Sequence, residues 1–312
     1  MNDRPIFIVG CARSGTTLIQ YMLRSHPRIS LPTGESHFIV PIYQNKDQYG
    51  DLRKQKNVRN VLEEMYQRSG DFLETDLHGI NFDIDSMTKL IVKRGCKTVP
   101  EIFSTIYEEN AKGEGKQRWG EKTPWYLFHM PLISEMFPGA QFIHILRDGR
   151  DVALSLFGRR HEFSVYNIHR AAEFWVIFLE RGQQLGAQMS PSVYLEVRYE
   201  DLLNKPEETV RSICDFLGEE YSDDVIHFRT STEAGKTPLL QKPIQKTNAY
   251  KWKNQLNKRQ IEVFEGVAYS VLKRNGYELV SNCQHITIFE KMFYRFHNAL
   301  FDLIYKKLFS LK

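Results

Sequence analysis

The chain has 312 residues, which is enough for two average domains or for one enlarged α/β domain with a large core. Apolar residues make up 42% and charged residues 26%, so disordered and collagen-like classes are excluded. The net charge of +4 is mild: it does not indicate nucleic acid by itself, and it suits a small polyanionic ligand equally well.

The cysteines and the amino-terminus give evidence on metal binding and on the cellular compartment of the protein. Cys11, Cys96, Cys214 and Cys283 form no CxxC pair and no zinc-like spacing with histidine, so we expect no metal site. Four scattered thiols suit a reducing compartment. No run approaches the roughly 18 apolar residues of a membrane span, and residues 1–5 lack the apolar core of a signal peptide. We therefore expect a soluble, cytoplasmic protein.

The first 24 residues predict a strand, a glycine-containing loop and a helix. Residues 5–9 are a continuous apolar run of strand length, and residues 16–24 have a helical pattern that Pro27 stops. This succession is typical of the start of a nucleotide-binding α/β domain.

The loop matches the phosphate-binding pattern G-x-x-x-x-G-K-[ST], except that Thr16 stands where the lysine should be. Its backbone N–H groups and the helix N-terminus would bind an anion, with hydroxyl donors from Thr16 and Thr17 and a positive charge from Arg13. Without the lysine and an acidic strand end, the site is not built for Mg²⁺-dependent phosphoryl transfer. The predicted phosphate-binding residues are Arg13, Ser14, Gly15, Thr16 and Thr17.

A second strand, residues 141–146, ends at Arg147, where a helix should start. Ser155 lies on that helix, and Arg159 is one turn further along on the same face. Two guanidinium groups and a hydroxyl can therefore converge on one phosphate beyond the carboxyl end of the strand. We expect Arg150 and Arg160 to be solvated at this basic helix start.

The remaining elements predict a three-layer α/β fold. Residues 193–197 form a third strand, and residues 206–217 a helix with proline in its first turn and Gly218 at its end. Residues 44–115 are polar and helix-like, and they either cover the sheet or line the acceptor side. Strands separated by long helical segments imply a P-loop-like fold with a mostly parallel sheet flanked by helices.

The carboxyl-terminal stretch, residues 286–312, alternates aromatics and leucines with basic residues at helical spacing. One interpretation is a helix at a membrane surface. The other is a terminal helix packed on the domain or on a partner. We assign residues 1–280 to the α/β domain and residues 281–312 to an amphipathic helical extension.

Two motifs together resemble a known family. Residues 7–18 look like the 5′-phosphosulfate-binding loop of sulfotransferases that use 3′-phosphoadenosine 5′-phosphosulfate (PAPS). Residues 142–155 resemble the 3′-phosphate-binding element of that family, in the right order and at the right strand ends. The similarity is greatest to the tyrosylprotein branch and spans roughly Pro5 to Trp252.

The resemblance implies a set of nucleotide contacts. Arg147 and Ser155 match the residues that bind the nucleotide 3′-phosphate, and Arg159 matches an assisting arginine. Tyr199 resembles a tyrosine that contacts the nucleotide. Lys242, in Gln241-Lys-Pro243, matches a lysine on a segment that closes over the cofactor.

The resemblance also implies catalytic roles. Glu35 matches the glutamate that serves as general base in the tyrosylprotein branch, and nearby His37 is the competing candidate, because small-molecule members use a histidine. Lys122 matches a lysine near the bridging oxygen of the donor, where it would stabilise the leaving group together with Arg13. Glu121 departs from the tyrosylprotein pattern. Sulfuryl transfer carries one fewer negative charge than phosphoryl transfer, so a metal is less needed.

We predict a PAPS-dependent sulfotransferase that moves a sulfuryl group to an acceptor hydroxyl by in-line transfer, with Glu35 as base. The acceptor could be a saccharide, a small alcohol, a lipid or a peptide tyrosine. The alternatives are a P-loop small-molecule kinase or NTPase, and a non-catalytic nucleotide-binding or scaffold protein. We expect no nucleic-acid partner; a homodimer and a peripheral membrane contact through residues 286–312 stay open.

Overall fold

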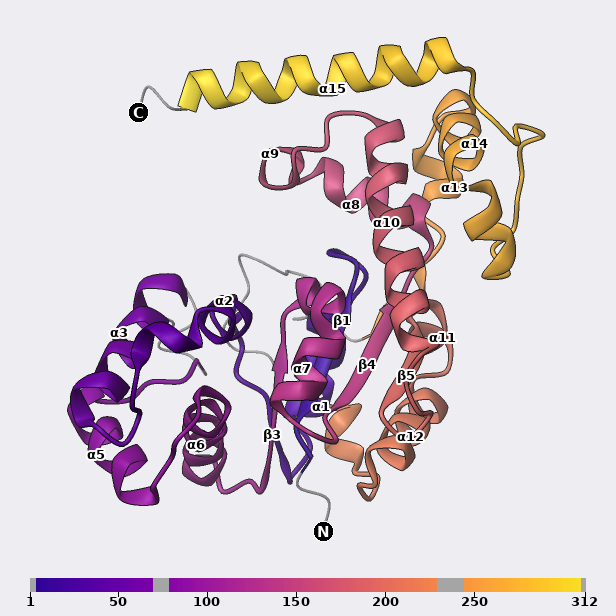
Figure 1. Cartoon of the computed structure of the whole chain (residues 1–312). Helices are drawn as coiled ribbons and strands as arrows, with labels where there is room; N and C mark the ends of the chain where they lie inside the picture. The colour runs from indigo at the N-terminus through magenta and orange to yellow at the C-terminus, as the bar shows by residue number, and fades with distance from the viewer. Residues whose placement is uncertain (1–3, 70–78, 229–243, 310–312) are drawn as a thin grey trace.

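The fold is built on a parallel five-stranded sheet, seen in a computed structural model that describes residues 4–69, 79–228 and 244–309 (Figure 1). The strand order is β2-β3-β1-β4-β5, so the first strand lies in the centre. All four neighbouring pairs are parallel. The strands are β1 (Ile6–Gly10), β2 (Ile29–Ser30), β3 (Arg118–Lys122), β4 (Gln141–Leu146) and β5 (Tyr194–Arg198).

One face of the sheet is covered by helices that follow β1 and β5. Because side chains alternate along a strand, Ile8 and Ile143 point to this face. They pack there with Ile19 of α1 and Ile213 of α12, all fully buried. The helices of this layer are α1 (Thr16–Arg24), α11 (Tyr199–Asn204) and α12 (Pro206–Leu217).

The opposite face holds a larger, aromatic core. Phe7 and Phe142 of adjacent strands stack with ring centroids 5.7 Å apart, and Trp119 meets Phe7 edge-on at 6.0 Å. Burial of these rings ties the second helical layer to the sheet. The elements of this layer are α2 (Ile39–Gln44), α6 (Val99–Gly113), η2 (Pro124–His129), α7 (Met130–Met136), α8 (Gly149–Phe157), α10 (Ile168–Gly186) and α14 (Lys258–Arg274).

The predicted polar region, residues 44–115, folds largely as helices beside the sheet edge formed by β2 and β3. Helices α3 (Gln55–Ser69) and α5 (Ile84–Arg94) pack on each other and, with α6, form the lobe at the left of Figure 1. Thr98 and Glu101 form a capping box at the start of α6. The short elements are η1 (Lys46–Tyr49), α9 (Arg160–Phe163), η3 (Asp223–Val225), η5 (Lys246–Asn248) and α13 (Trp252–Gln255).

Helix α15 (Ile288–Phe309) lies along the top of the molecule in Figure 1 and packs on α10. It falls inside the predicted extension, whose boundary at residue 280 stays a prediction. No helix within the described residues is long and apolar enough to cross a bilayer.

The predicted three-layer α/β class is confirmed. The helices 16–24 and 206–217 have the predicted bounds, and the strand predicted at 193–197 runs from Tyr194 to Arg198. Sequence reasoning missed β3, because its buried side chains include charges. Arg118 is fully buried, yet its guanidinium donates to the carbonyl oxygens of Arg4 and Leu217, both at 2.7 Å.

Candidate active site

The carboxyl ends of β1, β4 and β5 lie side by side. Gly10 pairs with Ile145, and Leu146 pairs with Arg198, so the loops after these strands begin next to one another. Ligands of parallel α/β sheets bind beyond this edge, where connections leave in opposite directions from the central strand. Arg147 directly follows β4, and Tyr199 directly follows β5, as the sequence predicted for these two residues.

Two glycines let the first loop approach its neighbours closely. Gly10 has φ +154°, and a Cβ there would lie 2.8 Å from the Ile145 carbonyl oxygen. Gly15 has φ +103°, and a Cβ there would lie 2.3 Å from the ring of Tyr199. Between them Arg13 adopts the left-handed conformation at φ +71°, which is uncommon for a residue other than glycine. The loop is therefore held in one shape against the ends of β4 and β5.

The loop leads into the amino-terminus of α1. Gly15 caps this helix without a side-chain hydrogen bond, and the first turn contains no acidic residue. The positive end of the helix dipole is thus not neutralised by its own first turn, which favours an anion. Ser14 and Thr16 are buried at this end, and Thr17 is half-buried.

Arg147 connects three segments of the site. Its Nη1 donates to the Arg13 carbonyl oxygen at 3.1 Å, and its Nη2 donates to the Asn248 carbonyl oxygen at 2.9 Å. The guanidinium also lies over the Tyr199 ring, 4.3 Å from the centroid. The buried Nε of Arg147 has no hydrogen-bond partner among the described residues. A buried charged donor without a partner is costly, so an acceptor atom of a ligand would be stabilised there.

A second group of side chains lies beside Arg147 and carries two positive charges. It consists of Arg13, Ser155 and Arg159. The Nε of Arg13 donates to Ser155 Oγ at 3.0 Å. Burial lowers the pKa of Arg13, and the positive charge of Arg159 lowers it further. The two guanidinium groups are therefore close enough to repel each other. The prediction that Arg159 shares a helix face with Ser155 is wrong, because α8 ends at Phe157. Arg159 instead precedes α9 and pairs with Glu162 at 2.8 Å, half-exposed.

The expectation that Arg150 is solvated is also wrong. Its side chain is fully buried, with ion pairs to Asp148 at 2.8 Å and to Glu265 at 2.6 Å, and it lies 3.6 Å from the Trp252 ring centroid. Asp148 is two residues away, but Glu265 and Trp252 come from distant parts of the chain, so sequence spacing gave no sign of the burial. Arg150 fixes the start of α8 rather than offering charge to a ligand, whereas Arg160 is exposed as predicted.

Sequence reasoning overlooked Asn248 and Lys251. Asn248 donates from Nδ2 to Tyr199 Oη at 2.5 Å, besides accepting from Arg147. Burial and then the nearby charge of Arg147 lower the pKa of Lys251. The only signal for them in the sequence is that both lie just before Trp252, at the end of the segment that resembles the family. The predicted Lys242 lies outside the described residues.

The candidate catalytic residues meet at the end of β3. Lys122 is nearly buried there, and its Nζ lies 2.8 Å from Glu35 Oε1. His37 Nε2 lies 3.1 Å from the other oxygen, Glu35 Oε2. Burial acts to raise the pKa of Glu35, but the Lys122 ammonium and the hydrogen bond from His37 outweigh it and lower the pKa to about 2. The hydrogen bond to Glu35 raises the pKa of His37.

Glu121 supports the loop that carries Glu35. Its buried carboxylate accepts hydrogen bonds from the backbone N–H of Ser36 at 3.2 Å, from Ser36 Oγ at 2.8 Å and from Thr123 Oγ1 at 2.5 Å. Burial raises the pKa of Glu121 to about 6. The side chain that departs from the family pattern therefore fixes the backbone beside Glu35. Its position next to Lys122 is the signal that could have indicated this.

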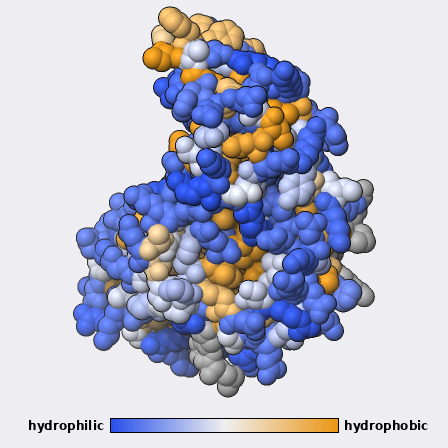
Figure 2. Space-filling view, turned by 90° about the vertical axis from the view of Figure 1, so that its right-hand side faces the viewer, coloured by the Kyte–Doolittle hydropathy of each residue, from blue (hydrophilic) through white to orange (hydrophobic). Residues whose placement is uncertain are grey.

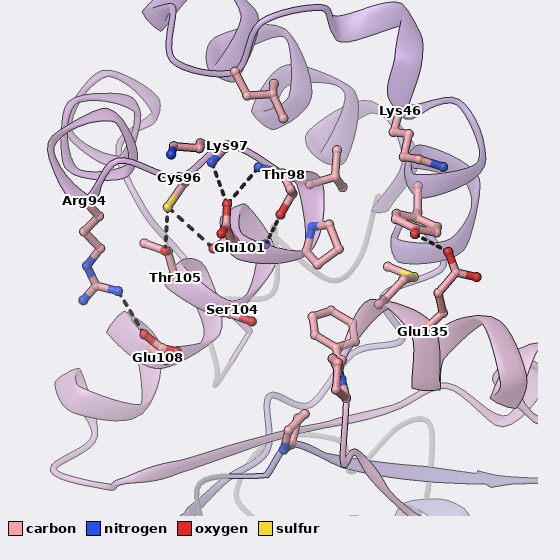
Figure 3. Close-up of a pocket in the computed structure, with 18 of the residues that line it drawn as sticks. Lys46, Arg94, Cys96, Lys97, Thr98, Glu101, Ser104, Thr105, Glu108 and Glu135 are labelled. Carbon is pink, nitrogen blue, oxygen red and sulfur yellow. Dashed lines mark hydrogen bonds and ion pairs between the residues drawn. The ribbon is translucent and has the colours of Figure 1, made fainter.

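A cavity of about 1020 Å³ lies elsewhere, near the amino-terminal ends of the strands (Figure 3). Its charged and polar groups largely pair within the lining: Arg94 with Glu108 at 2.9 Å, and Tyr43 with Glu135 at 2.8 Å. It contains none of the predicted site residues. Among the described residues, no group of three or more His, Cys, Asp or Glu side chains could hold a metal ion.

The residues at the carboxyl edge suit a nucleotide with two phosphate groups. The free Nε of Arg147, the helix end at Gly15 and the group around Arg13 offer donors and positive charge from two neighbouring strand ends. The candidate catalytic group at Lys122 lies at the next strand end, since Lys122 pairs in register with Ile8 of β1. This chemistry fits PAPS.

Comparison with known proteins bears on the family and on the fold. The profile of the Sulfotransferase family matches residues 5–223. Protein-tyrosine sulfotransferase A of Caenorhabditis elegans is 25% identical over 89% of this chain and 68% of its own length. The protein-tyrosine sulfotransferase of Drosophila melanogaster is 25% identical over 71% of this chain, which spans only 39% of that protein. The sulfotransferase domain of the curacin biosynthetic pathway shares the fold, with a TM-score of 0.58, 20% identity and coverage of 89% and 99%.

The chain belongs to the sulfotransferase family. The predicted enzyme class, PAPS-dependent transfer of a sulfuryl group to an acceptor hydroxyl, is confirmed at this level. The kinase and scaffold alternatives are not favoured.

Proposed function

We propose that the two strand-end motifs bind opposite ends of PAPS. Arg13 through Thr17 would hold the 5′-phosphosulfate, and Arg147 with Ser155 would hold the 3′-phosphate, assisted by Arg159. Support comes from the contact between the two groups, in which Arg147 donates to the Arg13 carbonyl oxygen at 3.1 Å. Tyr199 would contact the nucleotide, and Lys242 would close over it.

We further propose Glu35 as the general base that takes the proton of the acceptor hydroxyl. PAPS supplies the sulfuryl group, carried on a 5′-phosphate leaving group. Lys122 and Arg13 would stabilise charge on that side of the reaction. The observation that carries this proposal is the contact of Lys122 Nζ with Glu35 Oε1 at 2.8 Å, because it brings the base and the leaving-group cation to one point.

The pKa values add a condition to this mechanism. A carboxylate with a pKa of about 2 is a weak base, because proton transfer is most efficient when the pKa lies near the working pH. Lys122 would therefore have to leave Glu35 for the donor, which would let the pKa of Glu35 rise. His37 is the weaker candidate, because its raised pKa favours the protonated form.

The test is transfer from labelled PAPS to saccharide, alcohol, lipid and tyrosine-peptide acceptors, followed by Glu35→Gln with the best acceptor. We expect kcat to fall by about 100- to 10,000-fold, the usual contribution of a positioned base, with affinity for 3′-phosphoadenosine 5′-phosphate unchanged. Glu180→Gln, an exposed glutamate on α10, is the matched control. Full activity of Glu35→Gln beside an inactive His37→Gln would transfer the role to His37.

The acceptor and the location belong to the proposal. A hydroxyl-bearing acceptor follows from the family, and a saccharide, a small alcohol, a lipid and a peptide tyrosine are the classes to compare. We propose a cytoplasmic location, in keeping with four cysteines that are all free thiols. A homodimer, and a peripheral membrane contact through residues 286–312, are the further partners to test.

A further inference from the structure

Helix α15 packs on the protein with polar and tyrosine side chains, among them Tyr294 and Tyr305, and turns most of its apolar side chains outward. Asn298 accepts a hydrogen bond from the backbone N–H of Tyr166 at 2.8 Å, and Asp302 accepts one from Ser164 Oγ at 2.7 Å. Arg295 pairs with Glu173 of α10 at 2.7 Å. An ordinary terminal helix buries its apolar stripe on the core, so this orientation is the reverse of the usual one.

The outward face is a continuous apolar strip. Its members recur every three or four residues, which places them on one side of the helix. Phe289 is 85% exposed, Phe296 68% and Leu303 65%. Figure 2 shows hydrophobic atoms at the top of the molecule, where Figure 1 places the start of α15. We call this surface the α15 strip: Ile288, Phe289, Met292, Phe293, Phe296, Leu300, Leu303 and Ile304.

The charges beside the α15 strip are positive. At 100° per residue, Lys291, Arg295 and Lys306 lie along one edge of the strip, and all three are exposed. Arg295 also pairs with Glu173 and Lys306 with Asp302, both at 2.7 Å near solvent, where such pairs are weak. The helix has four cations and two acidic residues among its described side chains, and the acidic ones are already engaged. Glu290 pairs with Arg259 of α14, and Asp302 accepts a hydrogen bond from Ser164 and pairs with Lys306. A partner that covers the strip therefore meets aromatic and aliphatic side chains flanked by positive charge.

We propose that the α15 strip docks on the surface of an anionic lipid membrane, with the helix in the plane of the interface. A helix of 22 residues is about 33 Å long, and it would lie along the headgroup boundary with its aromatic side chains in the acyl region. The exposed lysines would contact anionic headgroups. The proposal is independent of the sulfuryl-transfer mechanism.

A second copy of the chain fits this surface less well. In an antiparallel twofold pairing of the strips, each basic edge would face the basic edge of the other copy. The acidic side chains that could offset this repulsion already contact the protein itself. An anionic membrane brings the opposite charge to the whole edge.

The experiment is co-sedimentation of the full chain with vesicles of phosphatidylcholine and phosphatidylglycerol in equal parts, and with phosphatidylcholine vesicles alone. We expect binding to the anionic vesicles that weakens as salt is added. The triple variant Phe289→Ser, Phe296→Ser and Leu303→Ser should lower the partition coefficient at least about tenfold, because three large apolar side chains are removed. Circular dichroism should show an unchanged fold.

Two further variants keep the test sharp. Ile177→Ser with Val280→Ser removes exposed apolar side chains outside α15 and should leave vesicle binding unchanged. Lys291→Glu with Lys306→Glu keeps the strip and should abolish the preference for anionic vesicles. The proposal is overturned if the wild-type chain binds neither vesicle, or if the triple variant binds as well as the wild type. A wild-type dimer that binds no vesicles and becomes monomeric in the triple variant would assign the strip to a second copy.

Discussion

The nucleotide half and the acceptor half of the site are held together in different ways. In the nucleotide half, Arg147 is buried at a strand end and hydrogen-bonded to two backbone carbonyl oxygens. In the acceptor half, Glu35 and His37 lie on a loop, partly exposed, and are held by ion pairs between side chains. The first half is preorganised for one shape of ligand, whereas the second can exchange partners during a reaction.

The largest expected effect on nucleotide binding comes from breaking the rigid half. Arg147→Ala should weaken binding of 3′-phosphoadenosine 5′-phosphate by about 10- to 100-fold, because a charge-assisted donor and the link between two loops are both lost. The preference over plain AMP should disappear with it. Isothermal titration and thermal shift with both nucleotides measure this.

Two variants serve as controls for Arg147→Ala. Arg147→Lys keeps the charge and loses the fork of two donors, so its affinity should lie between those of the wild type and the alanine variant. Arg160→Ala removes an exposed arginine nearby and should bind like the wild type. An undiminished preference for the 3′-phosphate in Arg147→Ala would mean that this phosphate binds elsewhere.

The acceptor half should show itself in the pH dependence of stability. The pKa of Glu121 is raised from 4.5 to about 6, so the folded state holds this proton more tightly than the unfolded state. The free energy of unfolding should therefore fall by about 2 kcal/mol as pH rises through 4.5 to 6, and the loss persists above. Glu121→Gln should remove this slope, as measured by urea unfolding across that range.

Glu35 predicts the opposite sign in a lower window. Its pKa is depressed from 4.5 to about 2, so its contribution to stability is present above pH 4.5 and is lost as pH falls toward 2. Partial exposure makes this effect smaller than that of Glu121.

A Glu121→Gln protein that keeps the wild-type slope between pH 4.5 and 6 would contradict the assignment of that slope to the buried carboxyl of Glu121.

The smallest expected effect tests whether the nucleotide half is uniformly rigid. Arg159 is half-exposed and pairs with Glu162 near solvent. Arg159→Ala should weaken nucleotide binding by only about two- to fivefold, since exposed charge pairs contribute little. A loss as large as that of Arg147→Ala, in the same titration, would show that Arg159 is a principal ligand.

The same contrast explains how much the sequence could predict. The nucleotide half consists of apolar strands followed directly by glycine or arginine, and short-range patterns identify such elements. That is why β1, α1, β4, and the positions of Arg13 and Arg147 were predicted. The relation of Arg159 to Ser155 was predicted wrongly, because it depends on where α8 ends.

The elements that sequence patterns did not identify contain buried charged side chains. β3 contains Arg118, Glu121 and Lys122, all buried, so it lacks the apolar run of a central strand. Each has a partner far away in the chain, such as the Leu217 carbonyl oxygen for Arg118 and Ser36 for Glu121. Arg150 was misjudged for the same reason. Tertiary partners decide whether such a charge is inside or outside, and one sequence does not reveal them.

The position of Arg147 has a consequence for the motions of the whole chain. One guanidinium ties residues 13, 147 and 248, which belong to the beginning, middle and late parts of the polypeptide. A ligand that engages this side chain would lower the opening rates of all three segments together. Amide hydrogen exchange should then slow in concert at these distant places rather than only around the first loop.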